Sequence, residues 1–333
     1  RQAKDGKYIA FVAARLLPLA SERTEALSFD AFGQARTRRD SARSVTALKS
    51  SAQFYTKLFG PMPYSPLSLA LVESAVPGGH SPPGLLILQQ RPPLMGGNLK
   101  DDPATFYDIF GFFLAHEMAH QWWGHGVTPR SYRDRWVSEG FAQYAAALWT
   151  RESQGEETFN RVLKKLATWS KRMTAFGPVD LGNRVGHIQN NAQAHRAVVY
   201  DKGALVLDMV RRLIGDDAFG KSLKRIQSEN RFRKIDSETV RRAFEKEGSM
   251  DLDGLWEVFV RNVTLPSMRI ETHHATGAEV VIDGYSGPLP VVVQVGDARV
   301  NLIVSGRRKI PGATSGVRVA LDPDGIGLLT VTR

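Results

Sequence analysis

Two histidines and a glutamate in one short segment could do metal chemistry. His116, Glu117 and His120 stand in the order His-Glu-x-x-His. In a helix, positions i and i+4 share one face, so both imidazoles can direct a nitrogen at one point, where zinc would fit. Glu117 then lies beside the first ligand, where its carboxylate could take a proton from a water molecule at the metal. The same pattern also fits a helix that carries two histidines by chance.

A third ligand is needed, because a catalytic zinc usually has three protein ligands and keeps one position for water. His125 is close in sequence, but on a continuing helix it would point about 140° away from His120. Glu139 is separated from His120 by 18 residues and could complete a His-His-Glu group if its helix packs antiparallel against the first. The helix dipole alone also favours a glutamate in a first turn, so spacing leaves both interpretations open.

The elements that must position these residues follow from hydrophobic periodicity. Asp102 and Pro103 are suited to begin the helix that carries the two histidines, and Gly124 is suited to end it. A second helix, predicted for residues 138–149, carries Glu139 near its start. Upstream, the pattern predicts strands at 7–16, 67–72 and 85–88 and a helix at 44–60. Downstream, it predicts helices at 156–174, 199–214, 217–230, 237–247 and 251–263.

The pattern changes at residue 267, after which short β-like runs are separated by Gly and Pro turns. The predicted strands are 279–282, 290–295, 300–304, 317–321 and 328–332. This region is therefore expected to be a small all-β module.

Composition limits the partners of the chain. Of the 333 residues, 42% are hydrophobic and none is cysteine, so a bound metal must rely on histidine and carboxylate ligands. The net charge of +10 is spread over scattered or short basic groups without a nucleic-acid-binding motif, so no nucleic acid partner is expected. No stretch reaches the roughly 18 apolar residues of a membrane span, and the first residues are not a signal peptide. Because the chain starts without Met, we expect a fragment, and its compartment and oligomeric state stay open.

The two helices together resemble a known family. HEMAHQWWGHGVT, followed by SYRDRWVSEGFAQY, is similar to the signature of the gluzincin metallopeptidases of the membrane alanyl aminopeptidase and leukotriene hydrolase family. That signature is HExxH, 18 residues, then glutamate in a WLNEGFA-like context. The resemblance implies one zinc ion per chain on His116, His120 and Glu139, with Glu117 as general base and a peptide as substrate. It also implies an α+β fold: a thermolysin-like catalytic domain with a helical continuation, followed by a small C-terminal β-sandwich.

Two further residues gain a role from the same resemblance. Tyr200 stands in Tyr-Asp-Lys-Gly-Ala, which is similar to the YxKGA motif of the family. There the tyrosine hydroxyl donates to the oxyanion of the tetrahedral intermediate. Read without the family, Tyr200 would more simply be a core aromatic. Asp134 matches an aspartate ahead of the WLNEG-like segment and is expected to hold a ligand imidazole by a hydrogen bond.

The chain departs from the family at the GxMEN motif, whose glutamate binds the free amino terminus of the substrate. Residues 78–85 align with GAMENWGL without gaps and place Ser81 where that glutamate stands. A serine offers a hydrogen bond but no negative charge to pair with an ammonium group. Gly79, His80 and Ser81 are therefore candidate substrate-binding residues, and the exopeptidase specificity of the family need not hold here.

The resemblance also suggests a division of the chain. Residues 1–30 would be the remnant of an N-terminal β domain, 31–266 the zinc metallopeptidase domain with its helical segment, and 267–333 the β module. The expected function is zinc-dependent hydrolysis of peptide bonds. Two alternatives stay open: a non-catalytic relative that uses the fold as a binding scaffold, and a zinc hydrolase of a small non-peptide substrate, as in an epoxide-hydrolysing branch of the family.

Overall fold

The computed structural model describes residues 10–24, 27–72, 79–89, 106, 108–187, 190–273, 277–314 and 316–332. The chain forms two compact units. The first consists of Arg1–Gly155 and Leu223–Asp236, and the second of Glu156–Ser222 and Ser237–Arg333. The expected three-part division at residues 30 and 266 stays a prediction.

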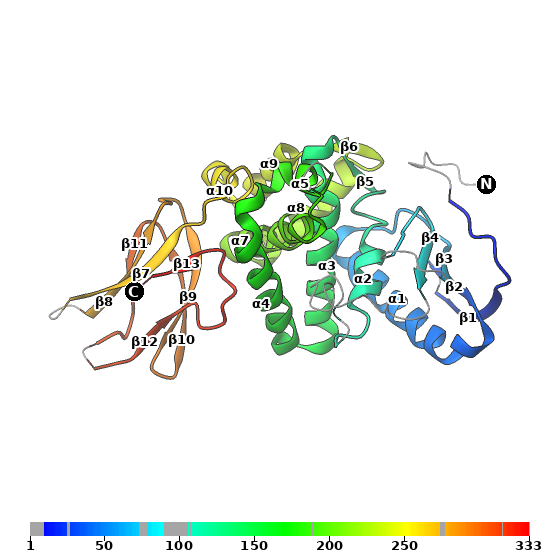
Figure 1. Ribbon diagram of the computed structural model, residues 1–333, viewed down its shortest axis with the longest axis horizontal. Helices are drawn as coiled ribbons and strands as arrows, with labels where there is room; N and C mark the ends of the chain where they lie inside the picture. The colour runs from blue at the N-terminus through cyan, green and yellow to red at the C-terminus, as the bar shows by residue number, and fades with distance from the viewer. Residues whose placement is uncertain are drawn as a thin grey trace. The chain divides into compact units, whose positions relative to one another are not determined.

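A four-stranded sheet opens the first unit, with the strand order β1-β2-β3-β4 (Figure 1). Its strands are β1 (Leu17–Arg23), β2 (Ser28–Gly33), β3 (Leu67–Val72) and β4 (Leu85–Gln89). β1 and β2 are antiparallel, whereas β2, β3 and β4 are parallel neighbours. The predictions for β3 and β4 are confirmed.

The predicted strand at residues 7–16 is wrong where the structure describes it, because residues 10–16 form no strand. The apolar side chain of Phe11 is 82% exposed, so this run has no sheet to cover. Among the described residues the first strand is β1, which pairs with β2 in the segment that was expected to be polar and irregular. In β2, buried and half-buried residues alternate and put Phe29 and Ala31 on the buried face.

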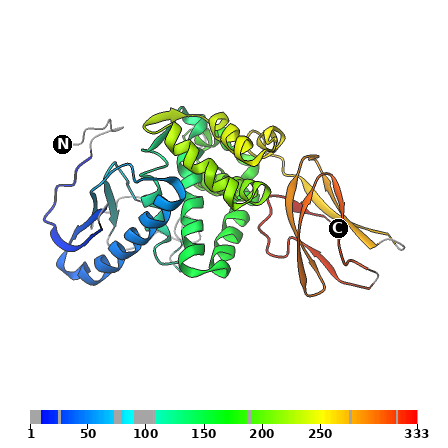
Figure 2. The same ribbon diagram turned by 180° about the vertical axis from the view of Figure 1, so that it is seen from behind.

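Helix α1 (Arg38–Phe59) connects β2 to β3 and packs beside the sheet, as Figures 1 and 2 both show. It begins six residues before the predicted start at residue 44. Its buried Tyr55 donates a hydrogen bond from its hydroxyl to the carbonyl oxygen of Ala115, at 3.1 Å. This bond joins α1 to the helix that carries the two histidines.

That histidine-bearing helix, α2 (Phe112–Ala119), is shorter than predicted. Asp102 and Pro103 lie outside the described residues. Gly111 precedes the helix with φ = +83°, a left-handed conformation that begins it there. The helix ends at Ala119 with His120 as its C-cap, so the prediction that Gly124 closes it is wrong.

Helix α3 (Trp136–Gln154) packs against α2 and begins two residues before its predicted start. Between the two helices run a short strand, β5 (Val127–Pro129), and a 3₁₀ turn, Tyr132–Asp134. β5 pairs in parallel with β6 (Arg233–Ile235), which a later part of the chain contributes to the same unit.

The second unit contains a group of helices and the β module. Most helices lie close to their predicted positions, and the structure bounds them as α4 (Glu156–Met173), α5 (Gly182–His187), α6 (Ala192–His195), α7 (Gly203–Ile214), α8 (Asp216–Glu229, from Leu223 in the first unit), α9 (Ser237–Gly248) and α10 (Asp253–Phe259). The predicted helix at 199–214 is interrupted: α7 begins only at Gly203 and is preceded by a π-helical turn, Arg196–Lys202.

Two sheets make up the β module, in the orders β10-β9-β12 and β11-β8-β7-β13. The strands are β7 (Ser267–His273), β8 (Gly277–Asp283), β9 (Leu289–Val295), β10 (Ala298–Val304), β11 (Arg307–Lys309), β12 (Val319–Leu321) and β13 (Thr330–Val331). The sheets contact each other through β8 with β10 and β7 with β12, and Val280, Val293 and Val304 are buried. This is the expected small β-sandwich, and the predicted α+β class is confirmed. Among the described residues, no helix is long and apolar enough to cross a bilayer.

Candidate metal centre

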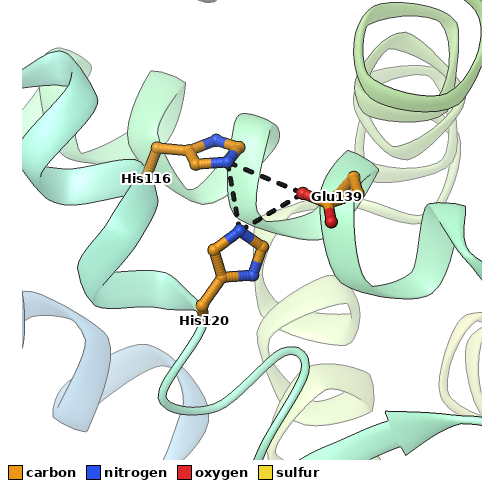
Figure 3. A group of neighbouring side chains, drawn as sticks. All are labelled: His116, His120 and Glu139. Carbon is orange, nitrogen blue, oxygen red and sulfur yellow. Dashed lines mark hydrogen bonds and ion pairs between the residues drawn. The ribbon is translucent and has the colours of Figure 1, made fainter. Parts of the chain in front are cut away.

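Three side chains from α2 and α3 converge on one point, as Figure 3 shows. His116 lies in the last turn of α2, His120 caps it, and Glu139 lies in the first turn of α3. The Nε2 atoms of the two histidines are 3.2 Å apart. Oε2 of Glu139 lies 3.2 Å from Nε2 of His120 and 3.8 Å from Nε2 of His116. Within the described part of the chain, this is the group of histidines and acids that could hold a metal ion.

The distances between these atoms fit zinc. Zinc binds histidine nitrogen and carboxylate oxygen at about 2.0 Å in tetrahedral geometry, which puts neighbouring ligand atoms about 3.3 Å apart. The three separations, 3.2, 3.2 and 3.8 Å, scatter around that value. All three side chains are nearly buried, with His120 the most exposed at 13%. The group therefore has both the donor set and the spacing of a zinc site.

The hydrogen bonds of His120 use its Nδ1 and leave Nε2, the ring nitrogen nearest His116 and Glu139, to bind a metal. Its Nδ1 lies 3.0 Å from the carbonyl oxygen of Trp123, which can only accept, so the Nδ1 hydrogen is donated there. The hydroxyl of Ser138 lies 3.3 Å from the same Nδ1 and donates to the same carbonyl. Because Nδ1 keeps its hydrogen, Nε2 is the atom that can offer a lone pair to a metal.

The charges of His120 and Glu139 stabilise each other. Burial would lower the pKa of His120, but the charge of Glu139 and its hydrogen bond outweigh burial and raise this pKa to about 9. Burial would raise the pKa of Glu139, yet the charge of His120, the nearby imidazoles of both histidines and the charge of Arg135 hold it well below its usual range. The other carboxylate oxygen of Glu139, Oε1, forms an ion pair with the guanidinium group of Arg135 at 2.7 Å. An ionised glutamate at this place favours a bound cation.

Glu117 is also buried, and it touches the segment that aligns with the GxMEN motif. The hydroxyl of Ser81 donates a hydrogen bond to Oε2 of Glu117. A Cβ atom built on Gly79 would lie 2.5 Å from Oε1 of Glu117, which is closer than real Cβ contacts come. His80 exchanges two backbone hydrogen bonds with Ile87, at 3.0 and 2.8 Å. Gly79 and Ser81, predicted to bind substrate, thus lie against the predicted general base.

The roles expected for Tyr200 and Asp134 stay predictions. Tyr200 belongs to the second unit and is half-buried on the π-helical turn Arg196–Lys202, with its ring 5.9 Å from that of His195. Asp134 is buried and caps its own 3₁₀ turn by accepting hydrogen bonds from the backbone and hydroxyl of Ser131.

Lys202 ends the π-helical turn and is buried. Its ammonium group donates to the hydroxyl of Thr174 and to the carbonyl oxygen of Asn262, both at 3.0 Å. Burial lowers its pKa to about 8, and the charge of Asp180 offsets only part of that shift. Lys202 therefore anchors the turn on which Tyr200 stands.

Sequence reasoning missed three partners of the metal group: Arg135, Ser138 and the carbonyl of Trp123. Arg135 stands four residues before Glu139, and this i, i+4 spacing could have indicated the ion pair. Ser138 and Trp123 meet His120 through the turn between α2 and α3, and nothing in their residue types indicates that contact.

Comparison with known proteins agrees with this geometry. A model of the peptidase family M1 domain matches residues 93–259, half of the chain, and this range contains the metal group. Aminopeptidase M1-B of Oryza sativa subsp. japonica is 24% identical over 275 residues, which covers 78% of this chain and 31% of that protein. Endoplasmic reticulum aminopeptidase 2 of Homo sapiens is 27% identical over 183 residues, covering 51% of this chain and 18% of that protein.

A solved structure shares the fold. The crystal structure of Legionella pneumophila aminopeptidase A in complex with aspartic acid superposes with a TM-score of 0.71 at 17% identity, covering 96% of this chain and 38% of that one. The chain thus spans between 18% and 38% of the length of these three proteins. With its His-His-Glu group inside the range that the family model matches, the chain belongs to the peptidase family M1.

Proposed function

We propose that this chain is a zinc metallopeptidase that hydrolyses peptide bonds. The observation that carries the proposal is the convergence of His116, His120 and Glu139 at zinc-like spacing, with Glu117 next to the first of them. Membership of a peptidase family supports the choice of a peptide as the substrate.

His116, His120 and Glu139 would hold one zinc ion per chain. Zinc bound there would supply a Lewis acid, which favours the addition of water to an amide carbonyl. Glu117 accepts a proton from the attacking water and returns it to the nitrogen that leaves as the C–N bond breaks. The carboxylate therefore acts first as a base and then as an acid, and ends the cycle ionised.

Tyr200 is the proposed donor to the oxyanion that forms from the carbonyl oxygen. Its place on a π-helical turn supports this role, because π-helical insertions are frequent at functional sites. The buried anchor Lys202 fixes the turn from the inside of the second unit, which would limit the movement of the tyrosine.

Ser81 leads us to propose a substrate class. The hydroxyl of Ser81 is bonded to Glu117 and brings no charge for a substrate ammonium group. We therefore expect peptides with a blocked amino terminus to be cleaved about as well as those with a free one.

A digest of matched peptide libraries, one with free and one with N-acetylated amino termini, tests both parts of the proposal. The wild-type chain is expected to bind one zinc per chain by metal analysis and to cleave both libraries. Glu117→Gln should keep zinc but lose roughly 10²- to 10⁴-fold in kcat, because it removes the base. Glu152→Gln, an exposed glutamate on α3, is the matched control and should behave as wild type.

Wild-type turnover in Glu117→Gln would contradict the assigned base. Strict dependence on a free amino terminus would contradict the substrate class. A zinc-loaded chain that ignores peptides but hydrolyses metabolites would indicate a small-molecule hydrolase, and one that hydrolyses neither would indicate a binding scaffold.

A further inference from the structure

We propose that Ser81 is a positioning residue, whose hydroxyl holds the carboxylate of Glu117 in the orientation that proton transfer requires. The inference rests on the proposed function, in which Glu117 moves the proton. It gives the position of the missing GxMEN glutamate a role in the chemical step instead of in binding the substrate's amino end.

The segment that carries Ser81 is held in place by side chains that follow the metal-binding helix. Nε2 of His125 donates to the carbonyl oxygen of Ser81 at 2.6 Å. The amide of Gln121 spans the next turn: it donates to the carbonyl of Pro82 at 3.1 Å and accepts from the backbone N–H of Gly84 at 2.9 Å. Together with the two backbone hydrogen bonds between His80 and Ile87, these contacts hold the backbone on both sides of the Ser81 side chain.

The contact assigns different tasks to the two oxygens of the Glu117 carboxylate. Oε2 accepts the hydrogen of Ser81, so Oε1 is left to take a proton from water. Oε1 faces Gly79, where even a methyl group would collide with it. Ser81 and Glu117 are 6% and 5% exposed, so little water competes for the hydrogen bond between them. Ser81 thus fixes the carboxylate of Glu117, and Gly79 leaves space beside that carboxylate.

The same geometry suits a hydroxyl at position 81 better than a carboxylate. An ionised carboxylate has no hydrogen to donate to Oε2 of Glu117, so it could not make the bond that Ser81 makes. Since Ser81 has one hydroxyl hydrogen, and Glu117 receives it, none remains for a substrate. Ser81 therefore acts through Glu117.

The test compares steady-state kinetics of zinc-loaded Ser81→Ala and Ser81→Thr with wild type. Ser81→Ala should lower kcat roughly 10- to 100-fold, because the base is less well placed, while KM and zinc content stay near wild type. Ser81→Thr keeps a hydroxyl and should recover most of the lost kcat. The control is Ser41→Ala in α1, which removes a buried hydroxyl that donates to the carbonyl of Thr37 and should leave both parameters unchanged.

A crystal structure of zinc-loaded Ser81→Ala gives a readout independent of activity. We expect the Glu117 carboxylate to leave the orientation seen here or to occupy more than one, with the three metal ligands unmoved. An unchanged single orientation of Glu117, or a kcat within about threefold of wild type, would overturn the proposal. If the wild-type chain binds zinc but has no turnover, the proposed function fails, and the orientation of Glu117 alone decides the role of Ser81.

Discussion

Two buried ionisable sites, one in each unit, keep their charge to different degrees. At the metal group, burial opposes the charge of both His120 and Glu139, but the two lie 3.2 Å apart and each holds the other ionised. At the π-helical turn, Lys202 donates to two neutral oxygens, and burial lowers its pKa to about 8. At the first site Glu139 therefore stays ionised beside His120, whereas at the second Lys202 loses its positive charge near pH 8.

This difference matches two different tasks. The first site offers an ionised carboxylate to a cation, and the second connects separate segments of the second unit. A buried carboxylate that stays ionised is useful where a metal replaces the proton of the facing histidine. A lysine that bonds to a hydroxyl and a carbonyl instead joins three parts of the second unit, at Thr174, Lys202 and Asn262. The first site therefore depends on charge, and the second on hydrogen bonds that connect separate segments.

The largest effect that could break this contrast comes from Glu139→Gln. The change removes the negative charge and one ligand, so we expect the chain to lose its zinc and on the order of 10³-fold in activity. Metal analysis after dialysis and peptide turnover measure both. Glu157→Gln is the matched control, because Glu157 also stands in the first turn of a helix, α4, but is exposed. Full zinc content in Glu139→Gln would show that the first site does not depend on charge.

Lys202→Met tests the second site through the pH dependence of the free energy of unfolding. The folded pKa of Lys202, about 8, lies below its ordinary value of 10.5, so the unfolded chain binds the proton more tightly. Burying the charged form of Lys202 therefore lowers the free energy of unfolding. This effect is fully present below pH 8 and disappears as the pH rises toward 10.5.

Between pH 7 and 10, the unfolding free energy of wild type should therefore rise relative to Lys202→Met by on the order of 2 kcal/mol. Chemical denaturation at several pH values measures this difference. Lys221→Met removes an exposed lysine of α8 and serves as control. A wild-type advantage that shrinks with rising pH would contradict the assigned direction of the shift.

The smallest expected effect is that of Ser138→Ala at the metal group. The hydroxyl lies beside Nδ1 of His120, but the carbonyl of Trp123 remains as the acceptor, so zinc affinity should fall only about tenfold. Competition with a chelator measures the affinity, with Ser51→Ala in α1 as a control for loss of a buried hydroxyl. An affinity loss as large as that of Glu139→Gln would place hydrogen bonding, not charge, first at this site.

The metal group could be predicted from sequence because its ligands lie on two helices close together in the chain. The i, i+4 spacing fixes His116 and His120 on one face, and the family pattern adds Glu139. The contact between Ser81 and Glu117 could not be predicted, because it spans 36 residues and depends on the turn that follows His80. The resemblance predicted only that a serine stands at the position of the GxMEN glutamate.

The fold shows the same limit. Strands β3 and β4 and most helices of the second unit follow from periodicity, since their apolar faces are regular. The start of α2 does not, because Phe106 and Ile109 are buried at helical spacing outside the helix, ahead of Gly111 with its positive φ. The exposed run that begins at Phe11 fails for the opposite reason: it has the composition of a strand but no partner among the described residues.

The hydrogen bonds of Gln121 and His125 have a consequence for any attempt to redesign the segment that carries Ser81. Both residues belong to the stretch that directly follows His120, and both hold the segment that carries Ser81. Grafting a GxMEN loop from a relative into residues 78–82 would therefore leave two donors aimed at a backbone that has moved. A specificity change of this kind would need the loop and the stretch after His120 to be exchanged together, because each holds the other in place.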